Sequence, residues 1–505
     1  MVKRFDAMPS DIRLSNSGPT RPSKHSGTMH SFLVNKRRSG ARLLLFFLIA
    51  SLIFFFSPQF GDASWSLRQP IDHTETIQKI REAQVQLQEQ WPRNPAATHR
   101  DFTIAALDRL AGCMETNSCG PGELTVIVLG SAHFGNSQRG HTSGEDIWAG
   151  SLINILQSHN YTLLYTYEPL ESLLVYKALS DYIPLVIMEA QATDQCVMLG
   201  TINREIAAAA KPKVHGLEWL DPEAELGCAK RVGFEEGIPV QKIRSLHFWV
   251  GQRHPLPSFT LSPENYTGWY ADTGNYYLGY HLEHCRHVSA ARPHKRRAFI
   301  LGKRPDYFSE EKYAWPRNVL EELTAEIGDG FEFVGGAGKK GVDEMPMKGI
   351  TNLGSMDKET WNREVAESAV MLGVGNPPLS PSPYDAWCLG VPFINPILRR
   401  DAKNPDDVSK WNVQHNALKD FGPPYVYHVW KEDKEALKQA IQSAISTPFE
   451  PFIPDRMKRE NVEQRLLHLV HHNWTAVAEE MIEDGTAKGF FSERLGQNTR
   501  NGLLL

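Results

Sequence analysis

The 505-residue sequence has no Asp-x-Asp pair, no Cys-x-x-Cys spacing, no internal repeat and only one long apolar run. The first two absences remove the usual signs of a carboxylate-bound divalent cation and of a structural zinc site. The lack of a repeat excludes a solenoid. A single apolar run excludes a multi-span membrane protein, and 41% apolar with 22% charged residues is ordinary globular composition. The length allows about three domains.

The net charge of the chain is negative outside the first 42 residues. The chain has 54 Lys and Arg against 59 Asp and Glu, a net charge of −5. Residues 1–42 contain nine basic and two acidic residues, a net charge of +7, so the rest of the chain carries −12. The body therefore offers no basic surface for a nucleic acid.

The apolar run Leu43–Phe56 directly follows the last basic residues of this N-terminal segment. A bilayer span needs roughly 17–25 residues, so the run and its flanks suit a thin membrane of the early secretory pathway. A cleaved signal peptide is a leader of roughly 15–30 residues, whereas here a longer segment precedes the run. We therefore predict an uncleaved signal-anchor at 43–58, a cytosolic tail at 1–42 and a lumenal body.

Six cysteines and three glycosylation sequons lie on the predicted lumenal side. An even number of cysteines without metal-binding spacing favours disulfides over buried thiols, but it does not define the pairs. Asn160, Asn265 and Asn473 each begin an Asn-x-Thr sequon and are the predicted glycosylation sites. The cysteines are Cys113, Cys119, Cys196, Cys228, Cys285 and Cys388.

Strand and helix patterns alternate along the body, which predicts an α/β fold with doubly wound parallel sheets. Ser66–Trp91 has helical spacing and is predicted to be a polar stem helix. The basic segment Arg286–Arg297 is predicted to link two domains. We expect a stem and lead-in at 59–120, a first domain at 121–290, a second domain at 291–490 and a tail at 491–505. The predicted strands are Leu124–Gly130, Tyr161–Tyr165, Pro184–Met188, Ala298–Gly302, Glu332–Val334, Ala369–Gly373, Val391–Asn395 and Tyr425–Trp430. The predicted helices are Ile147–Leu156, Tyr313–Ile327, Asp357–Ser368, Glu432–Ser446 and Asp455–Asp484.

The most distinctive segment is Gly373–Pro396, in which a strand ends in glycines and a proline-rich loop leads into a helix near Pro383. Asp385 falls in the first turn of that helix. Proline and an acidic residue there are ordinary helix-start chemistry. The same arrangement could bind a nucleotide, with Asp385 accepting hydrogen bonds from ribose hydroxyls. By contrast, Gly336–Gly341 is a lone G-x-G-x-x-G match and is weak evidence.

Ser380–Ala386 and Phe393–Pro396 resemble the donor-binding loop of glycosyltransferase family 18, the alpha-1,6-mannosylglycoprotein 6-beta-N-acetylglucosaminyltransferases. Further segments resemble the family in the same order along the chain. These are Gly144-Glu145, Leu217–Glu225, Tyr277–Tyr280, Leu301–Lys303 and Gln414-His415.

The resemblance implies a GT-B fold, with two Rossmann-like domains facing a cleft after an N-terminal transmembrane helix. It implies an inverting, metal-independent transfer of N-acetylglucosamine from UDP-N-acetylglucosamine to a mannose 6-hydroxyl of a glycoprotein N-glycan in the Golgi, with no cofactor. Glu145 would be the catalytic base, although it could instead be a helix-start acid. Glu218, Glu223 and Glu225 would contact the acceptor. The residues implied to bind the donor are Lys303, Gly375, Pro381, Ser382, Pro383, Asp385, Gln414 and His415.

Leu379 stands where the family has a second donor-binding glutamate. A related transferase that uses another sugar nucleotide or acceptor therefore remains an alternative. A non-catalytic, membrane-tethered glycan-binding protein is a third possibility.

Overall fold

The computed structural model describes residues 72–89, 99–197, 227–230, 235–249, 251, 254–265, 274–282, 285, 295–337, 347–448 and 450–484. The predicted cytosolic tail, the signal-anchor and the tail at 491–505 lie outside these residues. Among the residues that are described, no helix has the length and apolar character needed to cross a bilayer.

The first sheet is parallel throughout, with the strand order β2-β1-β3-β4-β5-β6. Continuous apolar runs such as that of β1 form its centre because a parallel sheet is buried on both faces. The first three predicted strands are confirmed to within one or two residues at each end. The strands are β1 (Val126–Gly130), β2 (Thr162–Thr166), β3 (Leu185–Glu189), β4 (Ile243–Leu246), β5 (Thr260–Ser262) and β6 (Tyr276–Tyr277).

The second sheet has the order β12-β11-β10-β7-β8-β9, with β13 also paired to β11. All its pairs are parallel except that of β11 with the short β12. From β7 the chain adds β8 and β9 on one side of the sheet, and it then adds β10 and β11 on the other side of β7. The strand order therefore reverses between β7 and β10. The strands are β7 (Lys295–Leu301), β8 (Glu332–Gly335), β9 (Ile350–Asn352), β10 (Ser368–Gly373), β11 (Phe393–Arg399), β12 (Asn412–Val413) and β13 (Val426–Trp430).

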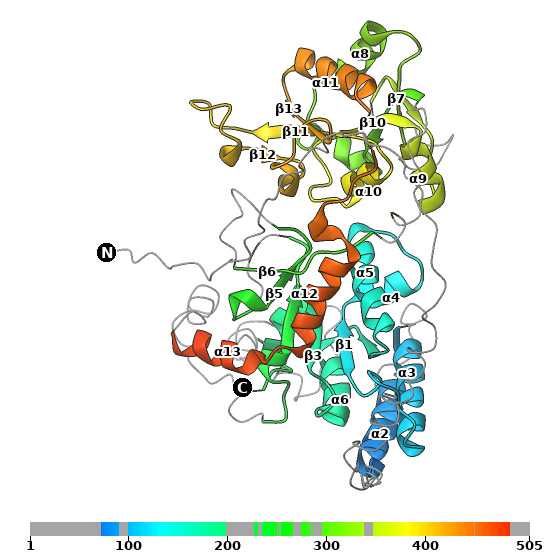
Figure 1. Cartoon of the computed structure of the whole chain (residues 1–505), viewed down its shortest axis with the longest axis vertical. Helices are drawn as coiled ribbons and strands as arrows, with labels where there is room; N and C mark the ends of the chain where they lie inside the picture. Colours follow the sequence, from blue (N-terminus) through cyan, green and yellow to red (C-terminus); the bar gives the residue numbers. More distant parts are fainter. Residues whose placement is uncertain are drawn as a thin grey trace, which may run out of the picture. The chain divides into compact units, whose positions relative to one another are not determined.

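Helices cover both sheets, which confirms the α/β prediction (Figure 1). Both sheets belong to one unit, Pro70–Leu505. The helices are α2 (Thr74–Glu89), α3 (His99–Glu115), α4 (Ala132–Gln138), α5 (Gly144–Ser158), α6 (Pro169–Leu179), α8 (Val319–Ile327), α9 (Lys358–Ala366), α10 (Ser382–Cys388), α11 (Lys434–Ser446), α12 (Arg459–His471) and α13 (Trp474–Glu483). Short 3-10 turns lie at η2 (Val240–Lys242), η3 (Pro257–Phe259), η6 (Pro305–Phe308), η7 (Val408–Lys410), η8 (Asn416–Leu418) and η9 (Asp455–Met457).

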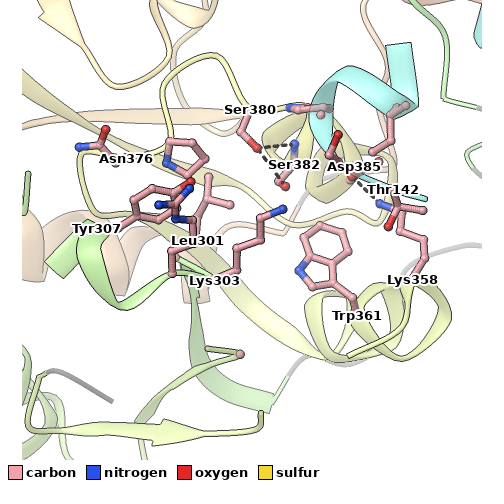
Figure 2. Close-up of a pocket in the computed structure, with 18 of the residues that line it drawn as sticks. Thr142, Leu301, Lys303, Tyr307, Lys358, Trp361, Asn376, Ser380, Ser382 and Asp385 are labelled. Carbon is pink, nitrogen blue, oxygen red and sulfur yellow. Dashed lines mark hydrogen bonds and ion pairs between the residues drawn. The ribbon is translucent and has the colours of Figure 1, made fainter. Parts of the chain in front are cut away.

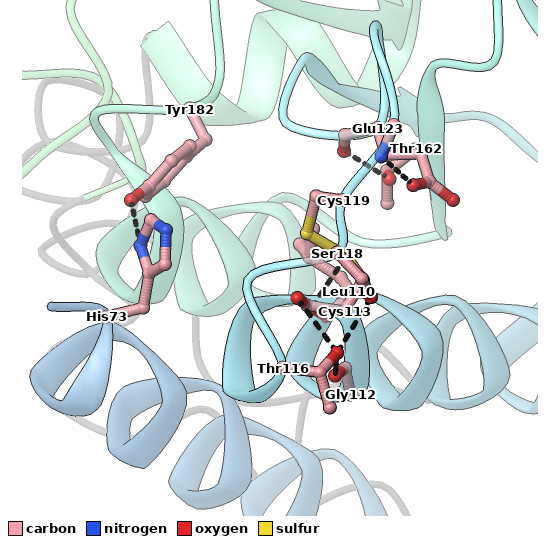
Figure 3. The surroundings of a disulfide bond; sticks show 11 residues. His73, Leu110, Gly112, Cys113, Thr116, Ser118, Cys119, Glu123, Thr162 and Tyr182 are labelled. Carbon is pink, nitrogen blue, oxygen red and sulfur yellow. Dashed lines mark hydrogen bonds between the residues drawn. A yellow bond between two sulfur atoms is a disulfide. The ribbon is translucent and has the colours of Figure 1, made fainter. Parts of the chain in front are cut away.

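The predicted stem helix differs from expectation, because α2 is packed into the body. Its apolar side chains Ile80, Ala83 and Leu87 are buried in one core with residues of α3, α6 and β1. Just before α2, His73 Nδ1 lies 3.0 Å from the hydroxyl of Tyr182 (Figure 3). The predicted helical spacing of α2 is confirmed over Thr74–Glu89. Its apolar stripe packs against neighbouring helices and so does not form a free spacer.

The C-terminal segment is also different, since the predicted helix Asp455–Asp484 is divided into η9, α12 and α13. The break comes at Asn473, whose side chain accepts a hydrogen bond from the backbone N–H of Thr475 and caps α13. Both helices return to the first sheet. Arg465 of α12 donates to the carbonyl of Leu278 at 2.8 Å, and Ala478 of α13 is buried with residues around η2 and η3.

Three disulfides confirm the cysteine prediction and supply the pairing that the sequence left open. Cys113–Cys119 closes a short loop at the end of α3 (Figure 3). Cys196–Cys228 and Cys285–Cys388 join segments that are 32 and 103 residues apart. The last of these attaches the segment that follows the first sheet to α10 of the second.

Candidate active site

A cavity of about 670 Å³ is lined by residues that follow strands of both sheets (Figure 2). Glu145 of α5 and Trp249, after β4, come from the first sheet's side. Lys303, after β7, and Asp385, in α10 after β10, come from the second. The carboxyl ends of β7 and β10 are where the topology of the second sheet switches, which is the usual ligand position in such folds.

Glu145 is the second residue of α5, but it does not cap this helix. The capping box is made by Ser143 and Asp146, whose side chains each accept a hydrogen bond from the other's backbone N–H. Asp146 also pairs with His133 Nδ1 at 2.8 Å. Among the described residues, Glu145 has no hydrogen bond or ion pair, and it lines the cavity. Asp146 therefore completes the capping box, while Glu145 remains in the first turn of α5, where an acid also interacts favourably with the helix dipole.

The start of α5 touches the loop that resembles a donor-binding loop. A Cβ added to Gly144 would lie 3.2 Å from Cδ of Pro381, so glycine permits a close approach here. Pro381 and Ser382 both line the cavity, as does Ser380. The structure thus brings Glu145 and the 380–382 loop to the same wall of the cavity.

Asp385 is almost completely buried, with 1% of its surface exposed, and its Oδ2 lies 2.7 Å from Nζ of Lys358. Lys358 is the first residue of α9 and was not picked out by the sequence analysis. The available signal was weak. A lysine at a helix N-terminus opposes the helix dipole and so suggests a specific partner.

Gln414 and His415 were predicted to bind the donor, but in the structure they do not line the cavity. The side chain of Gln414 forms hydrogen bonds with the backbone of the loop that follows β10. Its Oε1 accepts from the N–H of Gly375 at 2.7 Å, and its Nε2 donates to the carbonyl of Pro377 at 3.1 Å. His415 is buried, and its backbone exchanges two hydrogen bonds with the side chain of Asn395.

The other predicted site residues divide clearly. Lys303 is exposed in the cavity wall, whereas Gly375 and Pro383 are buried and do not line it. Glu218, Glu223 and Glu225 lie outside the described residues. Leu379, at the position of the family's glutamate, is buried with a left-handed φ of 53° and does not line the cavity.

Asn160, Asn265 and Asn473, which begin the three sequons, are exposed. No group of three or more His, Cys, Asp or Glu side chains in the described part of the chain is placed to hold a metal ion.

A buried polar cluster, which we call the Glu264 cluster, connects the two sheets. Glu264 follows β5 and is 1% exposed. Its carboxylate accepts hydrogen bonds from Tyr280 at 3.0 Å and from Tyr384 of α10 at 2.9 Å. His415 Nε2 lies 3.8 Å from Glu264 Oε1, and Arg456 of η9 donates to the hydroxyl of Tyr384 at 3.2 Å. One carboxylate thus joins the first sheet to the helix that carries Asp385.

Burial raises the pKa of Glu264 to about 7, against the opposing effects of the Tyr384 hydrogen bond, the charge of Arg456 and the Tyr280 hydrogen bond. Burial also lowers the pKa of His415 to about 3, so this histidine is neutral. Glu264 could not be recognised from the sequence, because nothing in the local pattern Ser-Pro-Glu-Asn distinguishes it from a surface acid.

Residues 234–484 match the family model described as glycosyltransferase family 18. This part of the chain belongs to glycosyltransferase family 18. This confirms the resemblance that the loop around Asp385 indicated. The matched region contains the whole second sheet and its side of the cavity, whereas Glu145 lies before it.

The similar curated proteins include alpha-1,6-mannosylglycoprotein 6-beta-N-acetylglucosaminyltransferase A of Rattus norvegicus and of Homo sapiens. Each is 21% identical to this chain over 233 residues, which is 43% of this chain and 30% of the relative. The match therefore spans less than a third of the length of these relatives.

Among solved structures, the chain is similar to AviGT4, a glycosyltransferase involved in avilamycin A biosynthesis. The TM-score is 0.34 at 11% identity, covering 72% of this chain and 98% of that one. It is also similar to sucrose-phosphate synthase from Thermosynechococcus elongatus, with a TM-score of 0.30 at 13% identity over 73% and 100% of the two chains.

Proposed function

We propose that this protein is an inverting glycosyltransferase that transfers N-acetylglucosamine from UDP-N-acetylglucosamine to a mannose 6-hydroxyl of a glycoprotein N-glycan, without a metal ion. Family membership and the name of the curated relatives support this donor and acceptor. The observation that carries the proposal is that Glu145 and Asp385 line one cavity from different sheets.

In this proposal the second sheet binds the donor. The almost fully buried carboxylate of Asp385 accepts hydrogen bonds from the ribose hydroxyls, and the wall formed by Lys303 and residues 380–382 lies along the rest of the nucleotide sugar. Hydrogen bonds to a charged acceptor contribute about 1.5–3 kcal/mol, so Asp385 would be a main determinant of nucleotide affinity.

Glu145 would act on the acceptor. As the acceptor oxygen attacks the anomeric carbon, the carboxylate takes the hydroxyl proton, and the bond from the anomeric carbon to the diphosphate breaks with its electron pair leaving on UDP. Attack opposite the leaving group inverts the configuration. A positioned general base commonly contributes 10²–10⁴-fold to the rate. The absence of a hydrogen bond to Glu145 from the described residues fits a group that receives the proton of its substrate.

The two sheets on either side of the cavity support the GT-B arrangement for this chain, with an acceptor-side and a donor-side domain. The anchor at 43–58 and a Golgi lumenal body remain predictions from the sequence. They can be checked by treating protein expressed in cells with an N-glycosidase. The exposed Asn160, Asn265 and Asn473 should carry glycans, so mobility on a gel should shift. Protein that is unmodified at all three would contradict the lumenal orientation.

The decisive experiment incubates full-length protein in detergent with a mannose-terminated N-glycan acceptor and a panel of sugar nucleotides, followed by mass spectrometry. We expect an increase of one N-acetylhexosamine from the UDP donor only. Glu145→Gln should lower the rate of product formation by about 10²-fold or more, whereas Glu480→Gln, the same change at an exposed site in α13, should leave it unchanged. Transfer from a different donor would support the alternative that Leu379 suggests. Glycan binding without any transfer or donor hydrolysis would support a non-catalytic glycan-binding protein.

A further inference from the structure

Lys358 occupies an unfavourable position for a cation. It is the first residue of α9, directly after Asp357, whose side chain caps the helix by accepting from the N–H of Thr360 at 2.7 Å. The N-terminal end of a helix carries a positive partial charge, so an ammonium group there is destabilising unless something else compensates. The structure shows the compensation, because Nζ of Lys358 lies 2.7 Å from Oδ2 of Asp385.

This ion pair is held at the cavity wall and is not on the open surface. The Lys358 side chain is 27% exposed, while that of Asp385 is 1% exposed. The ammonium group also lies 4.3 Å from the ring centroid of Trp361, close enough for a cation–π interaction. Both Lys358 and Trp361 line the cavity (Figure 2). Because Lys358 is accessible and Asp385 is buried, a ligand that enters the cavity can contact the Lys358 ammonium group directly.

The other cations of the cavity wall are placed differently. Arg304 is held to Asp306 at 2.8 Å in an exposed ion pair. Lys303, after β7, is exposed and lines the same cavity, but among the described residues its side chain forms no ion pair with Asp385 or with any other acid. Lys358 is therefore the cation in direct contact with the carboxylate assigned to the ribose. In a nucleoside diphosphate the diphosphate is attached to the ribose itself, so a group beside the ribose-binding acid is within reach of it.

We propose that Lys358 binds the diphosphate of the nucleotide-sugar donor and stabilises the negative charge that develops on it as the glycosidic bond breaks. The inference rests on the proposed function, of which it names a further catalytic residue. Before the donor binds, Lys358 neutralises Asp385, since an unpaired buried carboxylate is costly. On binding, ribose hydroxyls take over part of that role and the ammonium group contacts the diphosphate. Lys358 keeps its proton throughout, and the acceptor proton goes to Glu145.

A purely supporting role would give the same ion pair, so the test must separate contact with the diphosphate from orientation of Asp385. Calorimetry with UDP and with uridine does this, because both ligands contain the ribose and only UDP contains the diphosphate. The measured quantity is the ratio of the UDP affinity to the uridine affinity. Removing a charge-assisted contact to the diphosphate should lower this ratio about 10- to 100-fold.

We expect Lys358→Met to lower the ratio by that amount and Lys358→Arg to retain most of it, since arginine also pairs well with phosphate groups. Lys295→Met is the matched control, because Lys295 also lies 2.7 Å from a carboxylate, that of Glu367, but outside the cavity. It should leave the ratio unchanged. If Lys358→Met weakens UDP and uridine equally, Lys358 only positions Asp385 and the inference is wrong.

Lys358→Met leaves the buried Asp385 without this partner, so the variant could fail to fold. The comparison is then made between Asp385→Asn and the double variant Asp385→Asn with Lys358→Met, in which no buried charge is left. The ratio should again be about 10- to 100-fold lower in the double variant, and an equal ratio overturns the inference. Wild-type protein that binds neither UDP nor uridine would refute the proposed function itself.

Discussion

Glu264 provides a quantitative test of how the two sheets are joined. Its pKa is about 7 in the folded protein, compared with 4.5 as the ordinary value. At roughly 1.4 kcal/mol for each tenfold change in proton affinity, this difference corresponds to about 3 kcal/mol. Between these two pH values the folded protein binds more protons than the unfolded chain. The stabilising effect of the neutral carboxyl is therefore complete below about pH 4.5 and is lost as the pH rises through about 7.

The perturbation is Glu264→Gln, which keeps the shape and the acceptor oxygen for a tyrosine hydroxyl but removes the titration. Other groups titrate equally in both proteins, so their contributions cancel in the difference. We expect the free energy of unfolding of the wild type, relative to the variant, to fall by about 2–3 kcal/mol between pH 5 and pH 8. Urea denaturation of the oxidised protein at several pH values measures this. Tyr384→Phe removes one donor to the carboxylate and should move the transition to higher pH.

Parallel pH profiles for the wild type and Glu264→Gln would refute the reasoning. They would mean that the carboxyl group titrates in the folded protein as it does in the unfolded chain, and that the Glu264 cluster is open to water. A wild type that becomes more stable relative to the variant at higher pH would also contradict it, because that result requires the pKa of Glu264 to be lowered.

Four further outcomes follow from the site and the disulfides. Glu145→Gln should lower kcat by about 10²-fold or more and leave UDP affinity nearly unchanged; a near-normal kcat would show that Glu145 is not the base. Asp385→Ala should raise the donor KM about 10- to 100-fold with a smaller effect on kcat, measured by initial rates. Replacing Cys285 and Cys388 by serine opens a 103-residue loop and should destabilise the protein by up to about 4–5 kcal/mol, so an unchanged melting temperature would contradict a stabilising link. Activity should survive EDTA, and a loss that manganese restores would overturn metal independence.

Local sequence patterns predicted the elements that depend on local physics. The strand β1 has a run of buried apolar residues that is typical of a parallel interior strand, and Pro381 and Pro383 mark the start of α10. Asp385 was found because it stands in the first turn of that helix within a recognisable loop. Local spacing also predicted that α2 is a helix. It did not show whether the apolar side of this helix would be exposed or packed against other helices.

What the sequence did not predict depends on contacts between distant residues. Lys358 meets Asp385 from 27 positions away, and Glu264 meets Tyr384 from 120 positions away. Gln414 was recognised as a family position, but its partners are backbone groups of Gly375 and Pro377, which no pattern identifies. Such pairings follow from the strand order, so they become visible only when the two sheets are assembled.

The return of α12 and α13 to the first sheet has a consequence for synthesis of the chain. The last strand of that sheet, β6, ends at Tyr277, but the helix residues that contact it, Arg465 and Trp474, emerge almost 200 residues later. At about 5–20 residues per second, this interval is roughly 10–40 s. During that time the apolar surface around Phe259 and Tyr276 is uncovered while the second sheet is still being made. A chain that stops before Arg459 would keep this surface exposed permanently, which makes it a substrate for chaperones and quality control.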